Sequence, residues 1–293
     1  MKTILIAGGK GLIGTKLTSL LKTKGYSVRI LSRNPKKSEE FKWDPVNRDI
    51  DSKALEDVSV LINLCGEGIA DKRWTDKRKQ ELHDSRIETT NFLFSLKEQL
   101  PKLETYISAS GISCYGFEDQ NKYYTESDAY GLDYLSQLVK DWETAADQFS
   151  SICRVVTMRT SVVLSKDGGA FPKLLKPIQF GVGSPLGTGK QIMSWIHIDD
   201  LVSLFEFVIQ NKIDGPINAL AENISNEEIT KTIAKHLNKK ILLPNVPAFV
   251  LKLMLGDMSV LLLEGVHVSN QKLKNHNFKF QFPEISGAIK TLI

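Results

Sequence analysis

The residues with the clearest chemical meaning are glycines near the N-terminus, in the stretch GGKGLIG at residues 8–14. Two spacings typical of dinucleotide sites run through it, Gly9-x-Gly11-x-x-Gly14 and Gly8-x-x-Gly11-x-x-Gly14. Glycine permits a tight turn, close approach of the backbone to a pyrophosphate, and close packing of the helix that follows. The chemistry that this stretch predicts is binding of a nicotinamide dinucleotide.

The residues after the next predicted strand indicate which dinucleotide is bound. An NAD site usually has Asp or Glu about 20 residues beyond the glycines to bind the ribose 2′-hydroxyl, whereas Arg accommodates a 2′-phosphate. Here a strand-like run at residues 27–31 is followed by Ser32 and Arg33, and no acid stands there. We therefore predict NADP(H), with Ser32 and Arg33 at the 2′-phosphate and Lys36 or Lys37 as helpers.

Ser110 and His197 are polar residues placed where a substrate could be contacted. Ser110 follows a predicted strand at residues 106–108, and a hydroxyl at the carboxyl end of a central strand can hydrogen-bond a substrate carbonyl or hydroxyl. His197 lies between a predicted strand and a helix that Asp199 is expected to cap. Residues of both types also have structural roles at such positions, so we keep that alternative open for each.

These residues need a frame of alternating strands and helices to position them. The apolar run at residues 3–7 predicts a buried strand, and leucines at helical spacing follow the glycines. Further strands are predicted at 58–64, 155–158 and 217–220, and helices from Thr75 to about Leu100, at 135–149, and after Ser225, where Glu228 completes a capping box. The backbone at Leu64 to Gly66 is expected to line the adenosine half of the cofactor, because ligands bind at the carboxyl ends of parallel strands.

This alternation predicts an α/β fold, a Rossmann-type doubly wound parallel sheet with a smaller, discontinuous C-terminal lobe that faces the substrate. We assign residues 1–164, with 191–220 returning, to the NADP-binding domain, and 165–190 and 221–293 to the lobe. Residues 165–191 hold six of the twenty glycines and are expected to form loops and a short helix. Three phenylalanines near the C-terminus are expected in the core, in a terminal strand or hook: Phe278, Phe280 and Phe282.

Composition argues against several other classes of function. The net charge of +4 is spread along the chain, and neither an arginine-rich run nor a zinc-ligand spacing occurs, so we expect no nucleic-acid partner and no metal site. Three widely separated cysteines are typical of reduced thiols. No signal peptide is recognised, and charges interrupt the most apolar stretch, at residues 246–266. We therefore expect a cytoplasmic protein with a small-molecule substrate and no membrane partner.

Ordered sequence blocks from residue 4 to about residue 290 carry a resemblance to a known family. The chain resembles an extended short-chain dehydrogenase/reductase of the NAD(P)-dependent epimerase/dehydratase group, in the branch of "epimerase family proteins" that are often described as nucleoside-diphosphate-sugar epimerases. The matching blocks are GGKGLIG, LSRNP, VLINLCGEGIADKRW, SRIETT, ISASGISCYG, MRTSVVLSKDGGA, GVGSPLGTGKQIMSWIHIDDL and LPNVPAFVLKLMLGDMSVLLLEGVHVSNQKL. The resemblance favours the Gly8-x-x-Gly11-x-x-Gly14 spacing.

The resemblance also implies a set of cofactor-binding positions. They comprise the glycine loop and helix start, the end of the second strand, the exit of the next strand, the following helix and one residue after the sixth strand. The implied residues are Gly8, Gly11, Ile13, Gly14, Ser32, Arg33, Leu64, Cys65, Glu81, Arg86 and Val163, and Leu12 and Gly66 complete the predicted cofactor-binding set.

One departure from the family bears on catalysis. Active short-chain enzymes use a Tyr-x-x-x-Lys pair for proton exchange, yet no tyrosine in this chain has lysine four residues later. The pair would fall at Leu135 and Val139, which are aliphatic. Ser110 matches the family's substrate-polarising serine, with Ser108 or Ser113 as alternatives. Proton transfer would then need Tyr115, His197 or a water molecule.

Two hypotheses follow from this sequence. The first is an NADP(H)-dependent oxidoreductase or epimerase-like enzyme that exchanges a hydride with an unknown hydroxyl or carbonyl substrate. The alternative is an NADP(H)-binding sensor or partner-binding protein without turnover, because the Tyr-x-x-x-Lys pair is absent. We also leave open whether the chain forms a homodimer.

Overall fold

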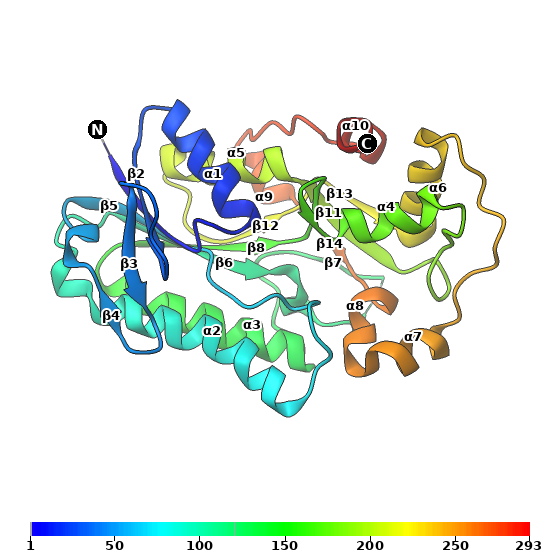
Figure 1. Ribbon diagram of the computed structural model, residues 1–293, viewed down its shortest axis with the longest axis horizontal. Helices are drawn as coiled ribbons and strands as arrows, with labels where there is room; N and C mark the ends of the chain where they lie inside the picture. Colours follow the sequence, from blue (N-terminus) through cyan, green and yellow to red (C-terminus); the bar gives the residue numbers. More distant parts are fainter. Residues whose placement is uncertain (1, 120) are drawn as a thin grey trace.

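A computed structural model describes residues 2–119 and 121–293 and contains a central eight-stranded sheet (Figure 1). The strand order is β12-β8-β6-β5-β1-β2-β3-β4, and neighbours are parallel except β3 and β4. This order runs outward in both directions from β1, so the predicted Rossmann-type doubly wound fold is confirmed. The strands are β1 (Thr3–Ala7), β2 (Ser27–Ser32), β3 (Glu40–Asp44), β4 (Asp49–Ile50), β5 (Val58–Asn63), β6 (Thr105–Gly111), β8 (Arg154–Thr160) and β12 (Gly215–Ala219).

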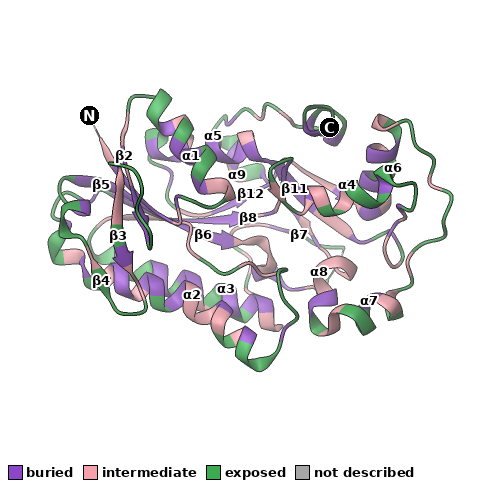
Figure 2. Ribbon diagram, viewed as in Figure 1, coloured by how far each residue is buried: buried purple, intermediate pink, exposed green. Residues whose placement is uncertain are grey.

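Helices cover both faces of this sheet. Two lie on one face and two on the other: α1 (Leu12–Thr23) and α5 (Ile198–Asn211), then α2 (Asp76–Ser95) and α3 (Tyr134–Asp147) (Figure 1). Successive side chains of a strand point to opposite faces. Ile6 of β1 therefore packs in one core with Leu17 and Leu204, whereas Leu5 packs in the other with Phe92. The central strands β1, β5 and β6 are accordingly mostly buried, whereas β3 and β4 at the edge are not (Figure 2).

A second, four-stranded sheet has the order β10-β9-β11-β13. Its strands are β9 (Val162–Ser165), β10 (Gly168–Gly169), β11 (Ile192–His197) and β13 (Glu222–Ser225), and α4 (Phe171–Gln179) and α6 (Asn226–His236) pack near it. The ranges predicted for the NADP-binding domain include β9 and β11, yet these strands pair with each other in the second sheet. The smaller sheet therefore begins before residue 165, because the chain crosses over directly after β8.

The C-terminal segment returns across both sheets. It contains α7 (Ala248–Leu255), α8 (Val260–Leu263), β14 (His267–Val268), α9 (Gln271–Asn275) and α10 (Ile285–Leu292). Strand β14 pairs with β7 (Tyr123–Tyr124), far away in sequence. Of the two predicted forms, strand or hook, the structure shows a hook, in which the Asp200 carboxylate accepts the backbone N–H groups of Gln281 (2.7 Å) and Phe282 (2.9 Å). Of the three phenylalanines only Phe278 is fully buried, because Phe280 and Phe282 pack on core edges.

Local signals placed several helix ends correctly. The Thr75 hydroxyl caps α2, and Ser225 and Glu228 form the predicted capping box at α6. Short 3₁₀ helices occupy other connections: η1 (Ser52–Ala54), η2 (Lys97–Gln99), η3 (Ile112–Tyr115), η4 (Gln148–Ser151) and η5 (Gly256–Ser259). Within the described residues, every helix is too short or too polar to cross a membrane.

Candidate functional site

The glycine loop between β1 and α1 has a geometry that only glycine tolerates. Gly8 has φ +79°, and a Cβ there would lie 2.8 Å from the carbonyl carbon of Leu64. A Cβ on Gly14 would lie 2.4 Å from the Gly8 carbonyl oxygen. The N–H of Gly11 donates to that same oxygen at 3.0 Å and closes the turn. The loop therefore brings β1, β5 and the start of α1 as close together as backbones allow.

The N-terminus of α1 is open for an anion. Its capping residue, Gly11, has no side chain to satisfy the first-turn N–H groups, and the first turn contains no acid. Leu12, Ile13 and Gly14 supply these N–H groups, which carry the positive end of the helix dipole. The predicted pyrophosphate positions thus lie together, and the arrangement fits a dinucleotide phosphate.

The end of β2 brings basic groups to the same side of the sheet. The hydroxyl of buried Ser32 accepts the N–H of Asn34 at 3.2 Å, so it shapes the turn that presents Arg33. Arg33 is exposed and makes no ion pair with another described residue. Lys10 was missed by sequence reasoning, although it lies in the glycine loop itself. Its Nζ donates to the Asn34 carbonyl (3.2 Å) and pairs with Glu40 (3.2 Å).

The exit of β5 is held by Asn63. Its side-chain oxygen accepts the N–H of Cys65 at 3.0 Å, and its amide nitrogen donates to Thr90 (3.1 Å) and Tyr106 (3.2 Å). Burial raises the pKa of the Cys65 thiol to about 12, although the nearby charge of Arg33 opposes this. The raised pKa keeps the Cys65 thiol protonated, so it packs in the structure as a small apolar group.

Glu81 and Arg86 shape the loop that follows β5. The guanidinium of Arg86 lies against Gly66, because a Cβ added to that glycine would be 3.0 Å from the Arg86 Cζ atom. The same guanidinium donates to the Glu67 carbonyl at 3.0 Å. Glu81 pairs with buried Arg78 (3.0 Å), which also pairs with Glu67 (3.2 Å). Burial lowers the pKa of Arg86 to about 10, so it stays charged at neutral pH. Arg86 thus contacts the loop backbone directly, whereas Glu81 reaches the loop only through Arg78, which donates to the Gly68 carbonyl at 2.8 Å.

The remaining predicted cofactor residue, Val163, lies in β9 close to α1. The β9–β10 hairpin covers the side chain of Leu12. A Cβ added to Gly169 would lie 3.4 Å from that side chain and 3.6 Å from the Val163 carbonyl oxygen. The second sheet therefore meets the first sheet beside the glycine loop.

Ser110 does not present a free hydroxyl to a ligand. It is buried in β6 and donates its hydroxyl hydrogen to Glu143 of α3. Arg159 of β8 binds the same carboxylate through two nitrogens, at 2.9 and 2.8 Å, and Tyr130 donates to it at 2.7 Å. In this structure the Ser110 hydroxyl thus meets a buried ion pair, and its substrate-polarising role stays a prediction.

Tyr115 belongs to the same buried network. Its hydroxyl donates to Asn218 of β12 at 2.6 Å and accepts from Arg159 at 3.0 Å. Burial raises the pKa of the phenol well above its ordinary value. The phenol is buried and uses both of its hydrogen-bonding roles within the protein, and its role in proton transfer stays a prediction.

His197, not Asp199, caps α5. The imidazole Nδ1 accepts the N–H of Asp199 at 3.1 Å, Nε2 lies 3.2 Å from the hydroxyl of Thr291, and the ring packs on Phe282. The side chain is 3% exposed, and burial lowers the pKa of the imidazole. The imidazole thus connects α10 to α5 in this structure, and its catalytic role stays a prediction.

A capping role predicts how His197 variants behave. His197→Ala should lower the free energy of unfolding by about 1–2 kcal/mol, because it removes the acceptor at the start of α5. His197→Asn supplies another capping oxygen and should recover most of this loss. Urea unfolding measures both, with NADPH affinity expected to be unchanged. If the Asn variant lost NADPH affinity while keeping stability, His197 would belong to the ligand site instead.

Of the serines left open by the sequence, Ser113 is the one with a free hydroxyl. Ser108 is 1% exposed and donates to the Ala109 carbonyl at 2.9 Å. Ser113 is half-buried, and its hydroxyl has no hydrogen-bond partner among the described residues. A Cβ on Gly111 would lie 3.3 Å from that hydroxyl and 3.9 Å from the side chain of Val139. Ser113 and Val139, the position predicted for the family's catalytic lysine, thus both border Gly111.

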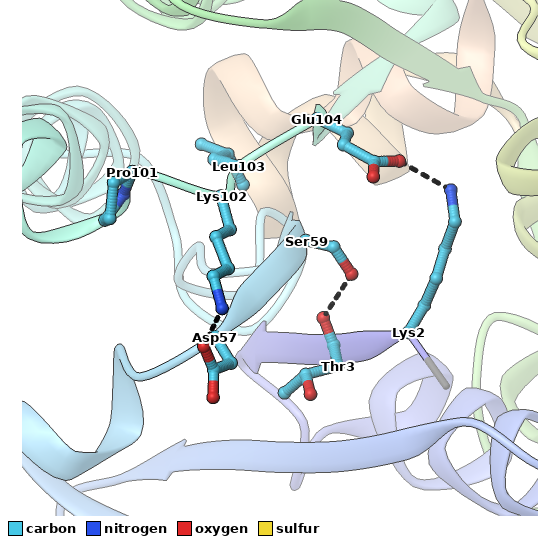
Figure 3. Close-up of a pocket in the computed structure, with 8 residues that line it drawn as sticks. All are labelled: Lys2, Thr3, Asp57, Ser59, Pro101, Lys102, Leu103 and Glu104. Atoms are coloured by element: carbon cyan, nitrogen blue, oxygen red, sulfur yellow. Dashed lines mark hydrogen bonds and ion pairs between the residues drawn. The ribbon is translucent and has the colours of Figure 1, made fainter.

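Two hollows occur among the described residues, and the smaller, of about 300 Å³, is lined by Tyr130, Glu143 and Arg159 of the network around Ser110. The larger, of about 740 Å³, lies at the amino ends of β1, β5 and β6, where Lys2 pairs with Glu104 and Lys102 pairs with Asp57 (Figure 3). Ligands of doubly wound sheets bind at the opposite, carboxyl ends. The candidate site is therefore defined by the glycine loop and strand exits, not by this hollow.

Comparison with known proteins agrees with this geometry. Residues 4–220 match the NAD dependent epimerase/dehydratase family, and residues 246–292 match a domain of unknown function, DUF1731. The chain belongs to the NAD dependent epimerase/dehydratase family. It is 31% identical over 296 residues to mouse epimerase family protein SDR39U1, with 99% of each chain covered. It is 36% identical over 304 residues to an epimerase family protein of Staphylococcus haemolyticus, covering 100% of this chain and 99% of the relative.

Solved structures of family members share the complete architecture. Human SDR39U1, crystallised with NADPH, superposes with a TM-score of 0.89 at 30% identity and covers 99% of this chain and 98% of its own. A nucleoside-diphosphate sugar epimerase from Corynebacterium glutamicum gives a TM-score of 0.81 at 30% identity, covering 98% of this chain and 57% of its own. The resemblance inferred from the sequence blocks is confirmed.

Proposed function

We propose that this family member binds NADP(H) and exchanges a hydride with a small hydroxyl- or carbonyl-containing substrate. The main support for the cofactor is the open N-terminus of α1, which follows a turn that only glycine can form. Arg33 and Lys10 lie at the end of β2, and no acid stands in the place that NAD requires. Human SDR39U1, a relative of 30% identity, was crystallised with NADPH, which supports this choice.

The residues of this chain divide into binding and orienting groups. The first-turn N–H groups of α1 hold the pyrophosphate, and Arg33 with Lys10 holds the 2′-phosphate. When bound, NADP(H) supplies or accepts a hydride at its nicotinamide ring. Ser113 is the described hydroxyl available to orient a substrate oxygen, and Val139 beside it supplies an apolar wall. A proton must then come from water or from the substrate itself.

The cofactor choice makes a quantitative prediction for Arg33. Arg33→Ala should weaken NADPH binding about 10- to 100-fold, because charge-assisted hydrogen bonds to phosphate are lost. NADH has no 2′-phosphate, so its affinity should change by less than about threefold. Isothermal titration calorimetry measures both, with Lys24→Ala, an exposed lysine at the far end of α1, as the matched control. Equal losses for the two dinucleotides would contradict the assignment of NADP(H).

A second candidate function is supported by a specific observation. Ser110, Tyr115 and His197 are all engaged in structural contacts, and Leu135 and Val139, which occupy the positions of the proton-transfer pair, are buried. A protein with this site could report NADP(H) occupancy without turnover. The signal would then be a change in the protein's conformation and not the release of a product.

Deuterium transfer distinguishes the two functions. NADPH carrying deuterium at the transferable nicotinamide position is incubated with the protein and a small-molecule extract, and products are analysed by mass spectrometry. Deuterium in a metabolite, lost in Ser113→Ala, supports the oxidoreductase. NADPH binding that alters protease sensitivity, with no deuterium transferred, supports the sensor.

A further inference from the structure

The outer end of the smaller lobe combines exposed apolar side chains with lysines. It is formed by residues 171–190 and 229–256, which we call the lobe end. These two segments contain three and five lysines and no Asp or Glu. Only Lys231 has an acidic partner, Glu227, in the described part of the chain. Seven large apolar side chains are exposed there: Phe180, Val182, Leu242, Leu243, Phe249, Leu253 and Met254.

The two segments form one continuous structural region. Val246 donates its N–H to the Pro185 carbonyl at 2.9 Å, and Gly187 donates to the Val246 carbonyl at 2.8 Å. The hydroxyl of Ser184 donates to the Pro244 carbonyl at 2.6 Å. Helices α4 and α6 pack together, and Figure 1 shows them with α7 at one end of the molecule. The exposed residues therefore belong to one end, remote from the glycine loop.

Helix α7 presents its apolar face outward. Phe249 and Leu253, four residues apart, are 71% and 77% exposed, and neighbouring Met254 is 68% exposed. Buried Leu251 anchors the opposite face. Lys252 is exposed beside the outward residues, and Figure 2 shows much of α7 exposed. A cluster of this kind is unusual on a soluble surface and marks a contact site.

We propose that the lobe end docks on the surface of an anionic lipid bilayer. Apolar side chains of α7 enter the boundary between headgroups and acyl chains, while the surrounding lysines lie against anionic headgroups. Charge complementarity favours this occupant. A second copy of the chain in a two-fold dimer would place the same lysines against each other, and nucleic acid offers no apolar layer for the exposed leucines.

This docking differs from what the sequence predicted. The expectation of no membrane partner rested on the lack of a spanning segment, and the structure shows no spanning helix among the described residues either. Contact with the bilayer surface needs only a short apolar face and nearby positive charge. Those features become visible only when the exposed side of α7 is known.

Vesicle flotation tests the proposal on the full-length protein. Wild type should float with vesicles of phosphatidylcholine and phosphatidylglycerol, remain unbound with phosphatidylcholine alone, and be released by added salt. Phe249→Ser/Leu253→Ser and Lys239→Glu/Lys240→Glu should each reduce the bound fraction about tenfold. Val46→Ser, which removes an 88% exposed apolar side chain in the β3–β4 turn, is the matched control and should bind as wild type does.

Separate measurements keep this test independent of cofactor binding. All variants should retain wild-type NADPH affinity, because the substituted residues lie outside the candidate cofactor site. Failure to float with anionic vesicles, or equal flotation with neutral ones, would overturn the proposal. So would a mass measurement by light scattering that finds a wild-type dimer converted to monomer by Phe249→Ser/Leu253→Ser, which would assign a second copy to this surface.

Discussion

Gly14→Ala is expected to abolish binding of NADPH. The added methyl group would lie 2.4 Å from the Gly8 carbonyl oxygen and 2.6 Å from the Gly9 Cα, and neither backbone atom can move without opening the turn. Opening the turn withdraws the first-turn N–H groups of α1 from the pyrophosphate. We expect at least a 100-fold loss of affinity, equivalent to about 2.8 kcal/mol, in isothermal titration calorimetry.

Thermal unfolding separates loss of binding from loss of structure. NADPH at about 100 times its Kd should stabilise wild type by about 2.7 kcal/mol and raise its Tm, whereas Gly14→Ala should show no rise. Gly287→Ala is the matched control, because a Cβ in that helix position meets no atom within 4 Å. It should bind NADPH as wild type does. A Gly14→Ala protein that kept the NADPH-dependent rise would contradict the proposed cofactor site.

Glu143→Gln is expected to cause the largest loss of stability among single polar substitutions considered for this chain. The side chains of Glu143 and Arg159 are 7% and 4% exposed, and Ser110 and Tyr130 also donate to the carboxylate. Glutamine keeps the shape but leaves the charge of Arg159 buried without its counter-charge. Breaking one side of a buried pair costs about 3–5 kcal/mol, which urea unfolding would show as a lower midpoint.

Two comparisons make this expectation specific. Lys102→Ala removes an equally direct ion pair, with Asp57, but both side chains are 67% exposed, so it should cost less than about 1 kcal/mol. The double substitution Glu143→Leu/Arg159→Met removes both charges together and should recover part of the loss. An E143Q protein as stable as Lys102→Ala would show that the network around Arg159 contributes little to folding.

Local patterns in the sequence were sufficient to predict the strand, the turn and the helix that form the cofactor site. The strand, glycine turn and helix at residues 3–23 form a single unit, and short-range hydrogen bonds define the caps at Thr75 and Ser225. Each of these features depends on residues within a few positions of one another. Lys10 was missed even so, because its contact with the end of β2 spans 24 residues.

The proposed catalytic residues depended on contacts that no local pattern contains. Ser110 was expected to face a ligand, but its partner Glu143 is 33 residues away, and Tyr115 meets Asn218 across 103 residues. The His197 imidazole lies 3.2 Å from the hydroxyl of Thr291, which is 94 residues later in the chain. A side chain at a strand end can point either way, and the elements packed beside it determine which.

The sequence by itself determined the α/β architecture, the family and the dinucleotide loop, because glycine spacing and apolar periodicity act over one strand–turn–helix unit. Only the tertiary structure decided which partners the side chains of Ser110, Tyr115 and His197 contact, that the Ser113 hydroxyl has no partner among the described residues, and that α7 turns its apolar face outward. The physical reason is that side-chain direction and exposure arise from packing between distant segments, and a linear pattern carries no information about which distant segment fills the space.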